Sequence, residues 1–222
     1  FYLEDRLVAE KKISAAVIKR LPRYYRYLSE LLEQGIDRIS SGELSKQMKV
    51  TASQIRQDLN CFGGFGQQGY GYNLQELHDE IGKILGVDQG YKTVLIGAGN
   101  LGRAIATHMN FNEYGCDLVG IFDSDPAKAG SVVAGLRVIP VSEMESFFQK
   151  EKPKIAILCI PKTAAQELAD KLVSLGITAF WNFSHYDIKV AHKDAAVENV
   201  HLGDSIMTLA YALTHSDDDN KS

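Results

Sequence analysis

Leucines at helical spacing are the first pattern in the chain. Residues 12–34 predict a helix that ends at Gly35, and Pro22 stands where a second helical segment can open within this stretch. The apolar stripe consists of Leu28, Leu31 and Leu32. Basic and aromatic residues take the other faces, so the pattern predicts an amphipathic helix with one buried side.

Two shorter helical patterns follow, joined by a tight connection at Lys49 and Val50. Ser41 is a candidate N-cap for a helix that ends near Met48, and Thr51 is a candidate N-cap for the next helix. The apolar positions of that next helix are Ile55, Leu59 and Phe62. Two short helices joined by such a turn are typical of a helix-turn-helix, whose second helix enters the major groove of DNA.

A glycine cluster comes directly after these helices. Its members are Gly63, Gly64, Gly66, Gly69 and Gly71, in partial alternation with Phe65, Tyr70 and Tyr72. The cluster predicts a β-ribbon, which after a helix-turn-helix is a wing against the DNA backbone, although a purely structural hairpin stays open. A phosphate-binding loop would follow a buried strand, and nothing before the cluster resembles one. Residues 74–86 predict a connecting helix.

The hydrophobic period changes after residues 87–92, the expected domain boundary. Apolar strands are predicted within 93–110, 116–126, 154–161 and 178–184, and they alternate with helices. This alternation predicts an α/β fold with a doubly wound parallel sheet covered on both faces, a Rossmann domain. We expect a winged-helix domain (1–86), a Rossmann domain (91–200), a C-terminal helix (201–215) and a disordered tail (216–222).

Three glycines after the first strand form the pattern G-x-G-x-x-G. In a strand–turn–helix context this is the dinucleotide fingerprint, whose glycines permit the turn, the approach of a pyrophosphate and close helix–strand packing. Asp123 ends the next strand, where a carboxylate binds ribose hydroxyls and repels a 2′-phosphate, so NAD(H) is expected rather than NADP(H). The predicted contacts are Gly97, Ala98, Gly99, Asn100, Leu101, Gly102 and Asp123.

The nicotinamide is expected across the ends of the later strands, near Ile160, Pro161 and Phe183. An apolar pocket disfavours the cationic oxidised ring, so it favours NADH over NAD⁺. The alternative is that these residues belong to the core, and it is the stronger interpretation for Ile160 alone. Cys159 beside them is expected to be packing rather than a redox thiol.

Composition and charge narrow the functional classes. The 222 residues carry a net charge of −4, yet residues 11–29 hold six Lys and Arg and no acid. A basic face of this kind can bind phosphate even on an acidic protein. The cysteines and histidines are scattered along the chain, which argues against a metal site and against disulfide bonds. This use of cysteine favours a cytoplasmic location of the protein. No apolar run reaches the length of a membrane span.

The C-terminal helix carries a single apolar stripe. Its members are Leu202, Ile206, Leu209 and Leu213, and Gly203 weakens its first turn. Such a stripe packs either on the sheet of its own chain or against a partner chain. The sequence pattern by itself leaves both arrangements open.

Three functions are compatible with these motifs. The first is a repressor whose DNA affinity responds to NADH through a coupling between two conformations. The second is a small NAD-dependent dehydrogenase with an accessory N-terminal domain, for which His185 is the one candidate acid–base residue. No second domain closes over a substrate, which disfavours it, because a Rossmann fold alone does not imply catalysis. The third is a DNA-binding protein with a purely structural nucleotide.

Joined in this order, the segments resemble the Rex family of bacterial redox-sensing transcriptional repressors, from about Ser14 to Leu213. The resemblance is carried by RYLSELLEQGIDRISSGELS, FGGFGQQGYGYN, GAGNLG, FDSDPAKAG and IPKTAAQ. It implies a homodimer with a winged helix at each end, a Rossmann core, and domain-swapped C-terminal helices beside the partner's nicotinamide pocket. It also implies a palindromic operator that is bound in the NAD⁺ or free state and released by NADH, and no enzyme activity.

The residues expected to contact DNA are Arg23, Ser41, Lys46, Lys49, Thr51, Ser53, Gln54, Arg56, Gln57, Gly66, Gln68 and Tyr70. Two of them depart from the family pattern. Gln57 stands where the family commonly has lysine; since glutamine pairs with adenine and lysine reads guanine, we expect an A·T pair opposite it. Gln68 stands where the wing tends to be basic, so we expect weaker and less salt-sensitive binding.

The residues of the ligand switch depart as well. His108 stands where the family often has tyrosine, and His201 with Leu202 where it often has an acid and an apolar residue. In the family pattern that acid exchanges partners with an arginine matching Arg26, and a histidine cannot make the same ion pair. We hypothesise that His108 and His201 meet across the dimer and make the response pH-sensitive. The alternative is that both are ordinary polar substitutions.

Overall fold

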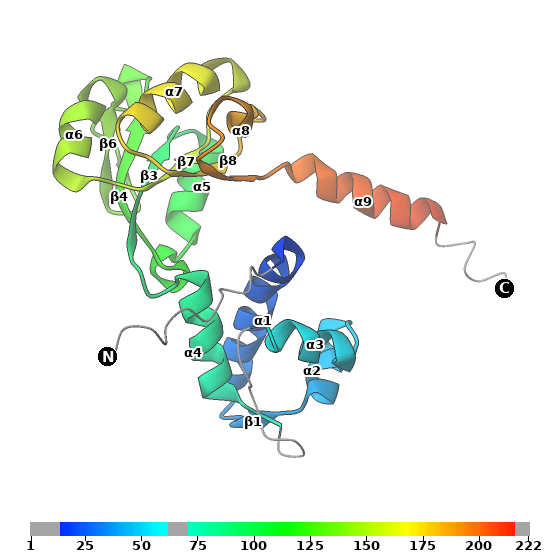
Figure 1. Ribbon diagram of the computed structural model, residues 1–222. Coiled ribbons are helices and arrows are strands. Elements are labelled where there is room, and N and C mark those ends of the chain that lie inside the picture. The colour runs from blue at the N-terminus through cyan, green and yellow to red at the C-terminus, as the bar shows by residue number, and fades with distance from the viewer. Residues whose placement is uncertain (1–13, 62–70, 216–222) are drawn as a thin grey trace, which may run out of the picture. The chain divides into compact units, whose positions relative to one another are not determined.

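The computed structural model describes residues 14–61 and 71–215, and the chain divides into two compact units, Phe1–Asp88 and Gln89–Ser222 (Figure 1). Phe62, most of the predicted wing with Gly66, Gln68 and Tyr70, and the tail 216–222 lie outside the described residues. Within the described part of the chain, no helix combines the length and the apolar character that crossing a membrane requires.

The first helix, α1 (Ala15–Glu33), is continuous, so the expectation of a second segment opening at Pro22 is wrong. Ser14 caps the helix, because its Oγ accepts a hydrogen bond from the Val17 N–H at 3.3 Å. Pro22 has no N–H to donate to the carbonyl of Ile18. Both residues are exposed, so water can satisfy that carbonyl and the helix continues.

Helices α2 (Ser41–Met48) and α3 (Ala52–Leu59) are joined by a three-residue turn, as predicted. The N-cap of α2 is Ser40 and not Ser41: the Ser40 Oγ accepts from the Glu43 N–H at 3.1 Å, and the Ser40 N–H donates to the Glu43 carboxylate at 2.8 Å. This reciprocal capping box satisfies two N–H groups at the start of the helix and places its N-cap at Ser40. Thr51 caps α3, accepting from the Gln54 N–H at 3.1 Å.

A two-residue strand, β1 (Arg38–Ile39), pairs antiparallel with β2 (Tyr72–Asn73), a pairing that the hydrophobic pattern did not predict. Gly71 makes it possible. It has a φ of 72°, and a Cβ there would lie 2.7 Å from the carbonyl oxygen of Ile39. The chain then enters α4 (Leu74–Leu85), which packs on α1 over a shared apolar core.

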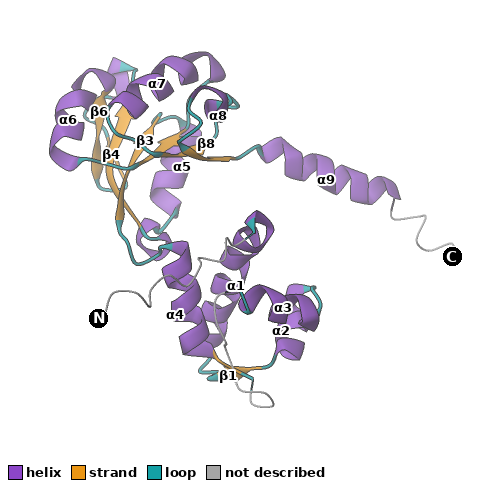
Figure 2. Cartoon of the chain, in the orientation of Figure 1, coloured by secondary structure: helices purple, strands orange, loops and turns teal. Residues whose placement is uncertain are grey.

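The second unit is built on a seven-stranded sheet (Figure 2). Its strands are β3 (Tyr91–Ile96), β4 (Cys116–Asp123), β5 (Val132–Val133), β6 (Leu136–Pro140), β7 (Ile155–Leu158), β8 (Ala179–Asn182) and β9 (Ala196–Asn199). The spatial order is β5-β6-β4-β3-β7-β8-β9, and every neighbouring pair is parallel except β5 and β6. The predicted Rossmann-like sheet is confirmed.

Helices cover both faces of this sheet. Alternate residues of β3 point to opposite sides, Val94 and Ile96 to one core and Leu95 to the other. The Leu95 face is covered by α5 (Asn100–His108) and the short helix η1 (Phe111–Tyr114). The opposite face is covered by α6 (Met144–Glu151), α7 (Lys162–Ser174) and α8 (Ile188–Ala191). Two further short helices are η2 (Pro126–Lys128) and η3 (Val141–Glu143).

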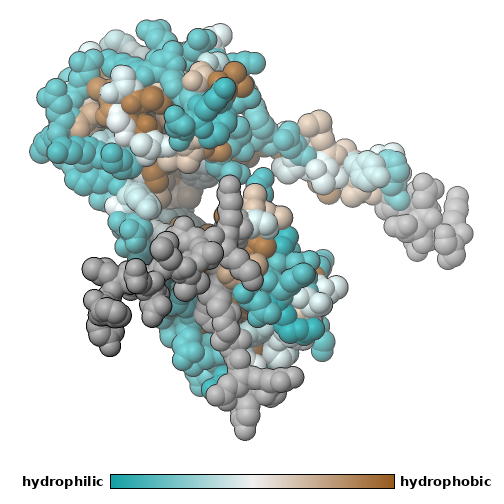
Figure 3. All heavy atoms as spheres, in the orientation of Figure 1, coloured by the Kyte–Doolittle hydropathy of each residue, from teal (hydrophilic) through white to brown (hydrophobic). Residues whose placement is uncertain are grey.

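The last helix, α9 (Leu202–His215), is exposed along its whole length. Its large apolar side chains, Leu202, Ile206, Met207, Leu209, Tyr211 and Leu213, are 58 to 71% exposed. In Figure 3, pale brown patches alternate with white and teal along this helix. Among the described residues of its own chain, α9 therefore has no core to pack against.

A carboxylate buried in the first unit ties α3 to α1. Asp58 is 1% exposed, and its oxygens accept two hydrogen bonds from the Arg20 guanidinium at 2.7 Å each. The Tyr24 hydroxyl donates at 2.9 Å and the Gln54 amide at 2.8 Å. Burial opposes ionisation of Asp58, but these donors outweigh it and hold its pKa below the ordinary value. The network fixes α3 on the helix beneath it.

We expect Asp58→Ala to lower the free energy of unfolding of the first unit by about 2 to 3 kcal/mol, because it leaves the buried Tyr24 hydroxyl and the half-buried Arg20 without their acceptor. Urea unfolding followed by circular dichroism measures the change. Glu33→Ala, which removes an exposed acid from α1, is the control and should change it by less than about 0.5 kcal/mol.

The difference in the free energy of unfolding between wild type and Asp58→Ala should depend on pH. A carboxylate whose pKa is lower in the folded state contributes its stability above its ordinary pKa of 3.8 and loses it as the pH falls toward the folded-state value. The difference between wild type and Asp58→Ala should therefore be full at pH 7 and shrink below about pH 4. A difference that stays constant down to pH 3 would contradict an ionised Asp58.

Candidate nucleotide and DNA sites

The glycine loop lies where the strand order of the sheet reverses. β7 is the neighbour of β3, although β4 follows β3 along the chain, and ligands of open α/β sheets bind at such a point. The loops after β3 and β7 approach closely there. Gly97 has a φ of 103°, and a Cβ on it would overlap the carbonyl oxygen of Cys159. Only glycine fits this position.

The loop leads into α5 with no side-chain cap on the helix, because its N-cap is Gly99. The first-turn N–H groups and the positive end of the helix dipole are therefore available to an anion. A Cβ on Gly102 would overlap the Gly97 carbonyl oxygen, whereas a Cβ on Gly99 would meet no described atom within 4 Å. The fold requires glycine at 102, and the open side of Gly99 is where a phosphate can approach.

Asp123 ends β4 beside this loop and is 7% exposed. Its Oδ2 accepts hydrogen bonds from the Ala98 N–H at 2.7 Å and the Lys128 ammonium at 3.0 Å, and its Oδ1 accepts from the Asp125 N–H at 2.8 Å. Burial opposes ionisation, but the donors prevail and hold the pKa of Asp123 below its ordinary value. Asp123 is thus a carboxylate that already braces the glycine loop.

A cavity of about 270 Å³ opens between these loops. It is lined by the glycine loop, by the acidic segment after β4 and by the segment after β7. The structure brings five predicted residues to its wall, Gly97, Gly99, Asp123, Ile160 and Pro161. Lys128 joins them, and the cavity therefore combines an acid–lysine pair on one side with apolar side chains on the other.

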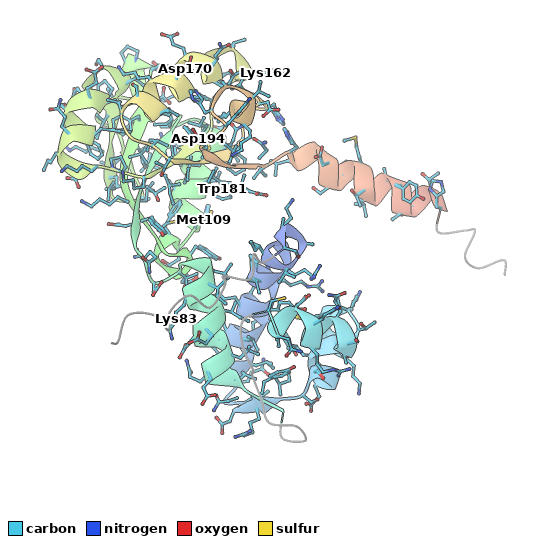
Figure 4. The ribbon with its side chains drawn as sticks, viewed as in Figure 1. Lys83, Met109, Lys162, Asp170, Trp181 and Asp194 are labelled. Atoms are coloured by element: carbon cyan, nitrogen blue, oxygen red, sulfur yellow. The ribbon has the colours of Figure 1, made fainter. Side chains whose placement is uncertain are left out.

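Phe183 does not line that cavity. Its ring packs against Trp181, which Figure 4 labels, with ring centroids 4.8 Å apart and an interplanar angle of 64°. Both residues join the core on the α5 face of the sheet, so a contact of Phe183 with the nicotinamide stays a prediction. Burial raises the pKa of the Cys159 thiol to about 12, so it is not a thiolate at neutral pH, as the expectation of a packing role requires.

The predicted DNA-contacting residues in the described part of the chain lie mostly on the surface. The exposed ones are Arg23, Lys46, Lys49, Thr51, Ser53, Arg56 and Gln57. Lys46 and Lys49 lie at the end of α2 and in the turn before α3. The structure therefore places two lysines beside α3, whose exposed face is polar. In protein–DNA complexes, side chains of this kind contact phosphates and base edges.

Four of these predicted contacts have partners inside the protein: Ser41, Thr51, Gln54 and Arg56. The Gln54 amide donates to Asp58, and the Arg56 guanidinium donates to the Ser41 hydroxyl at 3.0 Å. Gln54 thereby belongs to the network that holds α3 in place, and Ser41 orients Arg56. Gln57 is exposed on the same helix, and its contact with a base stays a prediction.

The predicted switch residue His201 has a partner within its own chain. Its Nδ1 lies 2.5 Å from the Nδ1 of His185, and the two rings stack with centroids 4.7 Å apart. His185, the candidate acid–base residue of the dehydrogenase hypothesis, thus contacts His201, the residue directly before α9. Arg26 and His108 are exposed, and the proposed meeting of His108 with His201 across a dimer stays a prediction.

Three functional contacts were missed from the sequence. Lys128 lies five residues after Asp123, in a segment where the sequence predicted a ligand contact only at Asp123. Asp58 follows Ile55 by three residues on the buried stripe of α3, and that spacing was a usable signal for a buried acid. The pairing of His185 with His201 had no local signal, because it joins a loop after β8 to the segment after β9.

Two family models match the chain. Residues 12–60 match a model described as "Putative DNA-binding protein N-terminus", and residues 88–186 match one described as "CoA binding domain". The first match spans α1 to α3, and the second spans most of the parallel sheet. The two matches fall on the two units of the structure.

Whole-chain relatives are also found. The chain is 53% identical over 208 residues to the redox-sensing transcriptional repressor Rex of Clostridium perfringens strain SM101, covering 94% of this chain and 98% of the relative. It is 55% identical over 206 residues to the Rex of Thermoanaerobacter pseudethanolicus, covering 93% and 92%.

Solved structures agree with these relatives. The crystal structure of RSP in complex with β-NAD⁺ and operator DNA is 54% identical and has a TM-score of 0.86, covering 94% of this chain and 96% of that one. The structure of RSP with β-NADH is 51% identical, with a TM-score of 0.85 and coverages of 95% and 98%. The dehydrogenase hypothesis is set aside, since these relatives are transcriptional repressors: the chain belongs to the Rex family of redox-sensing transcriptional repressors.

Proposed function

We propose that this chain binds a palindromic operator as a homodimer and releases it when NADH rather than NAD⁺ occupies the Rossmann domain. The observation that carries the proposal is the glycine loop at the switch point, where the uncapped start of α5 and the carboxylate of Asp123 face one cavity. Relatives at more than 50% identity are solved with NADH and with NAD⁺ plus operator DNA, which supports it. Such a protein acts in the cytoplasm.

The exposed face of the first unit is the proposed DNA surface. It is a winged helix-turn-helix in which α3 enters the major groove, while Lys46 and Lys49 contact phosphates. Arg56 and Gln57 read bases. This assignment is supported by the exposure of these side chains and by the internal network that holds α3 from beneath.

The dimer is proposed to form through α9. A helix with six large apolar side chains more than half exposed is an unfavourable surface for an isolated chain. Exchange of this helix between two protomers, as a domain swap, buries those side chains and carries Leu202 and its neighbours to the partner's Rossmann domain. The two recognition helices of the dimer then meet the two halves of a palindrome.

The redox response is a difference in affinity between two arrangements of the dimer. NADH has to bind more tightly to the arrangement that fits DNA poorly, since a ligand with equal affinity for both shifts nothing. A tenfold loss of operator affinity requires a coupling of about 1.4 kcal/mol. By linkage, operator DNA weakens NADH binding by the same factor.

The direct test is fluorescence anisotropy of a labelled palindromic duplex, titrated with the protein in the presence of NADH, of NAD⁺ or of neither. We expect at least tenfold weaker operator binding with saturating NADH and little change with NAD⁺. Operator binding that is indifferent to both nucleotides would contradict a redox response and leave a DNA-binding protein with a structural nucleotide.

Gly99→Ala tests the nucleotide site without disturbing the fold. The added Cβ has open space in the free protein but occupies the path of the pyrophosphate, so NADH affinity should fall about tenfold or more with an unchanged melting temperature. NADH fluorescence on binding measures the affinity. Gly42→Ala, whose Cβ would make only an ordinary contact with Ser40 at 3.7 Å, is the matched control and should bind NADH normally.

Gln57→Lys tests the base contact. Wild type should prefer an A·T pair at the position opposite Gln57, and the variant should prefer G·C there, each by about tenfold, because one bidentate contact discriminates by about 1 to 3 kcal/mol. Two duplexes that differ at this pair measure it. Lys49→Ala should instead weaken binding to both duplexes equally. An unchanged preference in Gln57→Lys would exclude Gln57 from base reading.

A further inference from the structure

Asn182, at the end of β8, is buried to 1% exposure, and its side-chain amide has all four of its hydrogen-bonding positions filled. Its Oδ1 accepts from the Ser184 N–H at 3.0 Å and from the Ser184 hydroxyl at 2.6 Å. Its Nδ2 donates to the Tyr186 carbonyl at 2.7 Å and to the Asn199 Oδ1 at 2.8 Å. The amide thus joins two segments, the loop after β8 and the end of β9.

The first of these segments is attached to the nucleotide pocket. The Phe183 N–H donates to the carbonyl of Leu158 at 3.0 Å, so the loop after β8 is fixed to the last residue of β7. The residues that follow β7, Cys159, Ile160 and Pro161, line the cavity. A change in the position of the β7 end is therefore transmitted to the loop that Asn182 holds.

The second segment is the root of α9. The Val200 N–H donates to the Asn182 carbonyl at 2.9 Å, and His201 pairs with His185. Together with the contact of Asn182 with Asn199, three successive residues before α9 are bound to the last residue of β8 and to the loop after it. Since α9 itself has no buried residue among those described, these contacts are what sets its direction within the chain.

We infer that Asn182 and Asn199 are positioning residues for the redox response: their hydrogen bond links the nucleotide pocket at the end of β7 to the root of the dimer helix α9. The inference rests on the proposed function, because it supplies the path by which an occupied pocket changes the angle between protomers. The link needs no movement of α9 relative to its own root. It requires only that the loop and the segment 199–201 move together.

Asn199→Ala is the test, in the full-length dimer. Asn199 is exposed, and its removal leaves the Asn182 amide bonded to Tyr186 and Ser184, so the fold should be kept. We expect NADH affinity without DNA to stay within about twofold of wild type, while the loss of operator affinity caused by NADH becomes at least fivefold smaller than in wild type. Anisotropy with and without NADH, together with NADH fluorescence, measures both quantities.

Two variants accompany it. Asn199→Asp keeps an oxygen that accepts from the Asn182 amide, and it should retain the wild-type response. Glu198→Ala removes the exposed neighbour on the same strand and should change nothing. As a structural measurement, hydrogen exchange at the Val200 amide should respond to NADH in wild type and Asn199→Asp, and respond less in Asn199→Ala.

The outcomes separate the inference from the proposed function. If wild type releases the operator with NADH and Asn199→Ala releases it equally, the link carries no signal and the inference is overturned alone. The same holds if Asn199→Asp loses the response while Asn199→Ala keeps it. If wild-type operator affinity ignores NADH, the proposed function fails and the inference fails with it.

Discussion

The carboxyl ends of β3 and β7 approach so closely that no side chain fits between their loops, and the rest of the nucleotide site depends on that contact. Gly97 turns the chain at a positive φ against the carbonyl of Cys159, and Gly102 lets α5 lie against the turn. These contacts fix where the uncapped end of α5 lies. Asp123 then holds the loop from the side through the Ala98 N–H. The site is therefore formed mainly by backbone and needs few side chains.

The first unit meets a different structural requirement, because a recognition helix has to present its polar side chains in a fixed orientation. α3 is only eight residues long, and helices of that length are not stable by themselves. Its apolar residues Ile55 and Leu59 supply burial, and the carboxylate of Asp58 supplies direction, since an ion pair with Arg20 at two points resists rotation of the helix. The buried ion pair thus holds the orientation of α3 on α1.

Features that depend on neighbouring residues were predictable from the sequence, and features that depend on distant ones were not. The glycine turn, the parallel strands and the Thr51 cap follow from local steric and hydrogen-bonding rules. The error of one residue at Ser40 was avoidable, since Ser40 and Glu43 have the spacing of a capping box. Strands β1 and β2 are only two residues long each, which is too short to produce a periodic signal. Arg20 and Asp58 lie 38 residues apart in the sequence, so no local pattern predicts their contact.

The exposure of α9 bears on the redox response proposed above for the dimer. A helix packed on its own sheet would share the rigidity of that core and would report little of a change at one pocket. Within the described part of the chain, α9 is held only at residues 199–201, so its direction is set by the few hydrogen bonds there, those of Asn182, Asn199 and the pair of histidines. Small displacements of the root then become larger ones at the far end, 14 residues or about 20 Å away along the helix. In the proposed dimer, a last helix that is exposed in the single chain is therefore suited to carry a signal from one protomer to the other.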